Sequence, residues 1–141
     1  MDYTDFLARV RQGTGLSREA AGQLTGAFLE TLGQRLLKVH RQHLAAQLPG
    51  ELKAHVLRHR RADQFSLEAF YIYVSARARL STHEAIRFSR VAGRVLAQAV
   101  APGELRDIFA ELPPEFGELV GDVPTTITNT TVDTHELYKR L

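Results

Sequence analysis

The chain has 141 residues, of which 44% are hydrophobic and 24% are charged, so it is large enough to form one domain with its own hydrophobic core. It has no cysteine, which excludes disulfides, zinc sites built on thiolates and cysteine nucleophiles. The net charge is +2, no apolar run approaches the ~20 residues of a membrane span, and the first residues are acidic. We therefore expect a cytoplasmic protein that is neither exported nor inserted in a membrane.

An internal repeat organises the chain. When the sequence is shifted by 64 residues it aligns with itself without a gap, and 11 of the 47 positions from 6 to 52 are identical. The matched positions are mostly apolar or structural, such as Phe6 with Phe70 and Val10 with Val74. Such a period predicts two copies of one helical unit, covering about 3–60 and 66–120. The repeat predicts a shared fold and no shared active site.

The first predicted helix of each unit is short. In the first unit it begins near Thr4, carries Phe6, Leu7 and Val10 at helical spacing, and ends at the glycines of 13–15. Its counterpart begins near Ser66 and carries Leu67, Phe70 and Val74.

The second helix of each unit is long. Ser17 and Ser81 are predicted to be its N-caps, because a serine oxygen accepts a hydrogen bond from a free amide of the first turn. In the first unit one apolar stripe then consists of Ala21, Leu24, Phe28, Leu32 and Leu36. In the second unit the stripe consists of Ala85, Phe88, Ala92, Val95 or Leu96, and Ala99, and Pro102-Gly103 ends the helix.

Two shorter helices complete each unit. The third is predicted over about 40–48 and 104–112, and Pro49 and Pro113 suit the first turn of the fourth. No strand-like alternation occurs before the tail. The predicted fold is therefore all-α: residues 1–122 form a bundle of two four-helix repeats related by a pseudo-twofold, and a mostly extended tail follows over 123–141.

The repeated pattern resembles a known family. Phe-Leu-x-x-Val, Leu-Ser-x-x-x-Ala, a long helix and a closing Leu-Pro-x-Glu-Leu/Phe each occur twice. In this the chain is similar, over about 3–120, to the bacterial domain-of-unknown-function family twenty-two sixty-seven, a duplicated helical domain. That resemblance implies a fold, and it implies no activity or catalytic residue.

The helical pair 4–36 is also similar to the first helices of histone-like HU proteins. HU proteins bind DNA through β-arms that follow these helices. Here a third helix and Leu48-Pro49 follow instead. The similarity therefore implies helix packing alone.

The tail carries the most individual pattern. Its threonine-rich stretch, 121–134, favours an extended spacer, because β-branched residues resist helix formation. The last residues, 135–141, then place Leu137, Tyr138 and Leu141 on one small apolar face. A spacer that ends in such a face is typical of a docking or cargo-targeting peptide for a protein partner. The alternative is that the segment covers its own bundle or stays without structure, since seven residues do not hold a helix alone.

Charge is distributed unevenly along the chain. Residues 38–61 hold six basic residues against one acid, and residues 104–122 hold one basic residue against six acids. Solvated helix faces, or pairing between these two segments, explain this pattern without any ligand. The alternative is weak, sequence-independent nucleic-acid binding, in which helical arginines neutralise phosphates. The residues for such a face are Arg58, Arg60, Arg61, Arg87, Arg90 and Arg94.

No catalytic, cofactor or metal site is predicted. The chain lacks a G-x-S-x-G elbow, a phosphate-binding glycine loop and an H-E-x-x-H pair. His40 with His43, and His55 with His59, have spacings that could share a helix face. A stable site needs a third and usually a fourth ligand, and the second unit does not repeat these histidines. We therefore expect a non-enzymatic interaction module.

Overall fold

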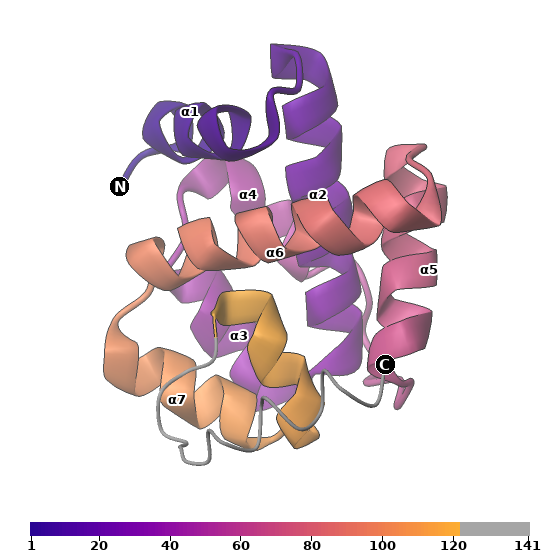
Figure 1. Cartoon of the computed structure of the whole chain (residues 1–141). Helices are drawn as coiled ribbons and strands as arrows, with labels where there is room; N and C mark the ends of the chain where they lie inside the picture. Colours follow the sequence, from indigo (N-terminus) through magenta and orange to yellow (C-terminus); the bar gives the residue numbers. More distant parts are fainter. Residues whose placement is uncertain (122–141) are drawn as a thin grey trace, which may run out of the picture.

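The computed structural model describes residues 1–121, and this part of the chain is built from helices (Figure 1). The all-α prediction is confirmed for these residues, and the predicted tail over 123–141 lies outside them. In chain order the elements are α1 (Tyr3–Thr14), α2 (Arg18–Arg35), α3 (Lys38–Ala46), α4 (Gly50–Val56), α5 (Leu67–Ala78), α6 (Thr82–Ala99), α7 (Pro102–Ala110) and the 3₁₀ helix η1 (Pro114–Val120).

The bounds of the helices follow the period of the sequence. Each of the last four elements begins and ends 64 residues after its counterpart among the first four, as a duplicated unit predicts. The two halves differ in their fourth element, because α4 is an α-helix whereas η1 is a 3₁₀ helix. Pro49 and Pro113, predicted to lie in the first turn of these elements, are their N-caps instead. Gly117, which stands where α4 has Lys53, weakens α-helix formation in η1 because glycine has low helix propensity.

Side-chain caps begin the four longer helices. The predicted caps are confirmed: Ser17 Oγ accepts from the amide of Ala20 at 3.1 Å, and Ser81 Oγ accepts from the amide of Glu84 at 3.0 Å. The Glu84 carboxylate in turn accepts from the Ser81 amide at 3.0 Å, which completes a capping box. Ser66 caps α5 in the same way. The first helix begins at Tyr3, one residue earlier than predicted, because Asp2 is its cap.

The third helix of each half begins two residues earlier than predicted, and the amide of the residue before it donates to a side chain of the other half. The amide of Leu37, before α3, donates to the Glu111 carboxylate at 2.9 and 3.1 Å. The amide of Ala101, before α7, donates to Gln47 Oε1 at 3.1 Å. The donor and acceptor positions of the two hydrogen bonds correspond under the 64-residue shift, since Leu37 becomes Ala101 and Gln47 becomes Glu111.

The two halves share one core. Helix α5 packs on α2 and α1 packs on α6, so the first helix of each half covers the long helix of the other as well as its own (Figure 1). Phe28, Phe70 and Phe116 come from α2, α5 and η1 and are fully buried. Their rings meet edge to face, with centroids 5.6 Å apart for the first pair and 6.1 Å apart for the second. Each such edge-to-face pair stabilises the fold by about 0.5–1.5 kcal/mol beyond the contribution of the buried ring surface.

Two glycines let the long helices touch the backbone of a neighbouring element. A Cβ on Gly33 of α2 would overlap the carbonyl oxygen of Val56 at the end of α4. A Cβ on Gly93 of α6 would likewise overlap the carbonyl oxygen of Leu119 in η1. Both glycines are buried in helix interiors, where glycine costs about 1 kcal/mol relative to alanine. Close helix packing therefore explains their presence.

A buried arginine donates hydrogen bonds to the carbonyl oxygens at the C-terminal end of α2. Arg41 of α3 is only 3% exposed and has no carboxylate partner among the described residues. Its guanidinium donates to three carbonyl oxygens, those of Gly33 at 2.9 Å, Leu36 at 2.8 Å and Arg60 at 3.0 Å. The cation thereby satisfies carbonyls at the negative end of the α2 dipole and fixes the loop that follows α4.

Candidate functional site

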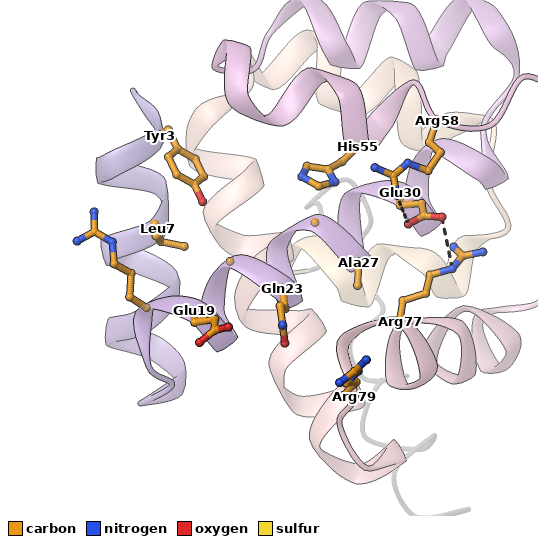
Figure 2. A pocket seen from close by; sticks show the side chains of 13 residues that line it. Tyr3, Leu7, Glu19, Gln23, Ala27, Glu30, His55, Arg58, Arg77 and Arg79 are labelled. Carbon is orange, nitrogen blue, oxygen red and sulfur yellow. Dashed lines mark ion pairs between the residues drawn. The ribbon is translucent and has the colours of Figure 1, made fainter.

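A surface cleft in the described part of the chain runs along one face of α2 and has a volume of about 650 Å³. Its floor includes Gly22, Gly26 and Ala27, which have little or no side chain. Figure 2 shows Tyr3 and Leu7 of α1 at one end, and Glu30 between Arg58 and Arg77 at the other. We call this hollow the arginine-lined cleft; its remaining lining residues are Arg18, Glu19, Gln23, His55 and Arg79.

Glu30 holds one end of the cleft together. Its carboxylate lies 2.9 Å from His59 Nε2, 3.5 Å from Arg58 Nη1 and 3.6 Å from Arg77 Nε. The Glu30 side chain is only 14% exposed, so these partners shield it from water. Arg77 also donates to Thr31 Oγ1 at 3.0 Å, which fixes its orientation. The anion is thus fully matched by cations supplied by α5 and the segment after α4.

The cleft carries a surplus of positive charge. Four arginines and two carboxylates line it, which leaves two positive charges when His55 is neutral. Arg58 and Arg77 pair with Glu30, whereas Arg18 and Arg79 form no ion pair with any acid of residues 1–121. Both are exposed, and Arg79 has the left-handed backbone (φ 59°) that ends α5. An anion that enters this cleft would meet two cations with which no acid of residues 1–121 pairs.

His55 lies against the floor of the cleft. A Cβ on Gly26 would come within 2.8 Å of its ring carbon Cε1, so the imidazole occupies the space that a side chain would take. Burial lowers the pKa of His55, and the neighbouring Arg58 lowers it further, while Glu30 opposes the shift. The imidazole is therefore neutral in the folded protein at pH 7.

This shift predicts a pH dependence of stability. A histidine whose pKa is lowered by folding takes up its proton in the unfolded chain first, so its contribution to stability is present above pH 6.5 and is lost as the pH falls. We expect the free energy of unfolding to fall less steeply between pH 7 and pH 5 in His55→Gln than in the unaltered protein. Urea titrations at several pH values measure this slope. His83→Gln, at an exposed histidine, is the control. Equal slopes in all three proteins would contradict the lowered pKa of His55.

The six arginines predicted to form a nucleic-acid face lie on two separate elements. Arg58, Arg60 and Arg61 follow α4 and are exposed. Arg58 pairs with Glu30 in the arginine-lined cleft, while Arg60 and Arg61 line a smaller hollow beside His59. The other three are on α6.

The α6 arginines have different surroundings. Arg90 donates to the Glu118 carboxylate at 2.7 Å, and Tyr71 Oη donates to the same carboxylate at 2.5 Å. Burial and this hydrogen bond raise the pKa of Tyr71. Arg87 covers the ring of Phe88. Arg94 is exposed and lines a second hollow, of about 610 Å³, between α1 and α6. Of the predicted face, Arg58 and Arg90 are thus paired within the protein.

The predicted pairing between the basic and acidic segments occurs through histidines. His40 Nδ1 lies 2.6 Å from the Glu111 carboxylate, and His43 Nδ1 lies 3.4 Å from that of Glu104. These two histidines do share the face of α3 that packs on α7. The suggestion that His55 and His59 share a helix face is wrong, because α4 ends at Val56.

The remaining predicted site residues are in the tail. Leu137, Tyr138 and Leu141 lie outside the described residues. Within residues 1–121, no three histidine or carboxylate side chains come together as a metal site would require. In the same range, no helix combines the length and apolar character needed to cross a membrane.

Sequence reasoning did not single out the arginine-lined cleft. Arg77 and Arg79 are not among the arginines predicted to form a nucleic-acid face, and Glu30 has no motif around it. One pattern does point to the cleft: Gly22 and Gly26 are four residues apart, so they share a face of a long helix in which glycine is costly. Paired glycines on one helix face indicate that something approaches the helix closely.

Comparison with known proteins assigns the chain to a family through its helical residues. No curated protein matches the chain. A family model does match residues 3–119, which run from the first residue of α1 almost to the end of η1. Its description is "uncharacterized conserved protein (DUF2267)". The match covers most of the chain, and the chain therefore belongs to the DUF2267 family.

Proposed function

We propose that this protein is a non-enzymatic interaction module that binds a protein partner in the arginine-lined cleft. The observation that carries the proposal is the cleft itself, an open hollow of about 650 Å³ in which Arg18 and Arg79 form no ion pair with an acid of residues 1–121. Charged side chains at the edge of a surface hollow steer and orient a partner of opposite charge. Tyr3 and Leu7 add the aromatic and apolar surface that interfaces use.

We propose the tail as a second point of attachment for such a partner. Its support is the sequence alone: a threonine-rich spacer precedes Leu137, Tyr138 and Leu141. Two weak contacts on one chain bind more tightly together than either does alone, because the second becomes intramolecular. The tail and the cleft are therefore expected to act on the same partner.

A pull-down from the native lysate tests both contacts. We expect the full chain to capture a partner. The amount captured should fall several-fold with Gly22→Leu, which fills the arginine-lined cleft. It should fall again when Leu137, Tyr138 and Leu141 are all changed to serine. Gly103→Ala, on exposed surface outside the cleft, is the control. Capture that survives both changes would refute the proposal.

Nucleic-acid binding is the second candidate, and the exposed arginines Arg58, Arg60 and Arg61 favour it. If it is correct, capture is abolished by nuclease and lost in Arg60→Gln/Arg61→Gln. Titration with duplex and single-stranded oligonucleotides at low salt gives a direct answer, since such binding rises steeply as salt falls. A flat titration at low salt would remove this candidate.

A further inference from the structure

We infer that the natural occupant of the arginine-lined cleft is an extended acidic peptide segment of the partner protein, with two carboxylates for Arg18 and Arg79. The inference rests on the function proposed above and specifies the chemistry of its partner. It follows from the length of the cleft, the position of its free cations and the nature of its floor.

The length of the cleft suits an extended chain. Its floor follows α2 from Arg18 to Glu30. Twelve helical steps correspond to roughly 18 Å at about 1.5 Å per residue. An extended peptide advances about 3.3 Å per residue, so five or six residues span this floor.

The free cations are on two elements. Arg18 is in the first turn of α2, whereas Arg79 is the residue that ends α5. In Figure 2, Arg79 lies apart from the group formed by Glu30, Arg58 and Arg77. A single phosphate or carboxylate is best held where several cations converge on one point. Cations on separate elements fit separate acidic side chains along a peptide.

The floor of the cleft admits a peptide backbone. At Gly22 a Cβ would have only Tyr3 Oη nearby, at 3.6 Å, so no part of the protein needs this glycine for close packing. Gly26 differs, because the His55 ring fills its space. The open surface at Gly22 lets a main chain lie directly on α2, and helix-interior glycine is otherwise unfavourable by about 1 kcal/mol.

One acid of the cleft favours a peptide over a nucleic acid. Glu19 lines the hollow with an exposed side chain and pairs with no cation of residues 1–121, whereas Glu30 is neutralised by Arg58 and Arg77. The Glu19 carboxylate repels a continuous chain of phosphates, whereas it can accept a hydrogen bond from an amide of a peptide. Tyr3 and Leu7 at one end offer contact to an apolar side chain of the same segment.

Fluorescence anisotropy tests the inference with a labelled hexapeptide of alternating glutamate and glycine, added to the full-length protein at low salt. Matched probes replace glutamate by glutamine or lysine, and a six-nucleotide single strand represents nucleic acid. Of these probes we expect only the acidic peptide to bind. Its affinity should be about tenfold lower for Arg18→Gln and for Arg79→Gln. Arg106→Gln, which removes one exposed positive charge from α7 outside the cleft, should bind normally.

Two further variants separate charge from shape. Glu30→Gln releases Arg58 and Arg77 from their internal anion, so it should tighten binding of the acidic peptide several-fold. Gly22→Leu keeps every charge and fills the floor, so it should weaken binding while the protein stays folded. The inference is overturned if the acidic peptide does not bind, or if Arg106→Gln weakens its binding as much as Arg18→Gln and Arg79→Gln do. It is also overturned if the oligonucleotide or millimolar inorganic phosphate binds the cleft at one molecule per protein and displaces the peptide.

These outcomes also distinguish the inference from the proposed function. If a lysate partner depends on Gly22 but is insensitive to Arg18→Gln and Arg79→Gln, the cleft is the binding site and its occupant is not acidic. If neither the partner nor the peptide responds to Gly22→Leu, the proposed function itself fails.

Discussion

Gly93→Ala is expected to lower the free energy of unfolding by at least about 3 kcal/mol, the upper end of what overpacking usually costs. The added Cβ would overlap the carbonyl oxygen of Leu119, so α6 and η1 would have to separate. Because the obstacle is backbone, no rotamer change relieves it. Gly33→Ala should have a comparable effect, since its Cβ would overlap the carbonyl oxygen of Val56.

Urea unfolding followed by circular dichroism measures this loss. Gly22→Ala is the matched control, because Gly22 is in a helix of the same length and has room for a Cβ. That control should be stabilised by up to about 1 kcal/mol through helix propensity. If Gly93→Ala were as stable as Gly22→Ala, the close packing of α6 on η1 would be wrong.

Arg41→Ala is the second change with a large expected effect, a loss of roughly 2–4 kcal/mol. The substitution removes three hydrogen bonds, two of them buried, and leaves the carbonyl oxygens of Leu36 and Arg60 without this donor, while that of Gly33 keeps the Leu36 amide at 3.3 Å. An unsatisfied buried polar group costs about 1–3 kcal/mol, and removal of a buried charge offsets part of the total. Arg41→Lys should restore little, because a lysine ammonium lacks the planar fork that reaches three carbonyls at once.

The comparison that isolates this effect is Arg60→Ala. Arg60 contributes its carbonyl oxygen to the Arg41 network, while its own side chain is exposed. Its truncation should change stability by less than about 0.5 kcal/mol. Thermal unfolding of the three variants ranks them directly, and equal stability of Arg41→Ala and Arg60→Ala would show that the guanidinium does not stabilise the end of α2.

Most of the helical architecture could be predicted from the sequence, because its signals are local. Ser17 and Ser81 mark the starts of the long helices, and the stripe from Ala21 to Leu32 is fully buried as its spacing indicates. The predicted starts of α3 and α7 are two residues late. Their cap residues, Leu37 and Ala101, make no side-chain capping bond, and their amides donate instead to Glu111 and Gln47, which lie far away in the sequence. Pro102, the first residue of α7, is a local start signal, but the prediction assigns it to the end of the preceding helix.

Most of the candidate site could not be predicted from the sequence. Glu30 meets His59 from 29 residues away and Arg77 from farther still, and no spacing rule connects them. The arginines that drew attention as a possible nucleic-acid face were chosen by charge alone, which does not reveal that Arg58 and Arg90 have internal carboxylate partners. Pairing between remote charges depends on how the helices pack, and helix packing is decided by the whole core.

The crossed packing of the two halves also bears on how the chain folds during synthesis. Helix α1 ends at Thr14 and one of its main partners, α6, begins only at Thr82. At ribosomal rates of about 5–20 residues per second, α6 is made roughly 3–14 s after α1. Over that interval the apolar side chains of α1 can pack on α2 and α4 but lack the cover that α6 provides. The nascent first half therefore stays incompletely buried until the second half reaches it, which is the period in which a chaperone or protease could act on it.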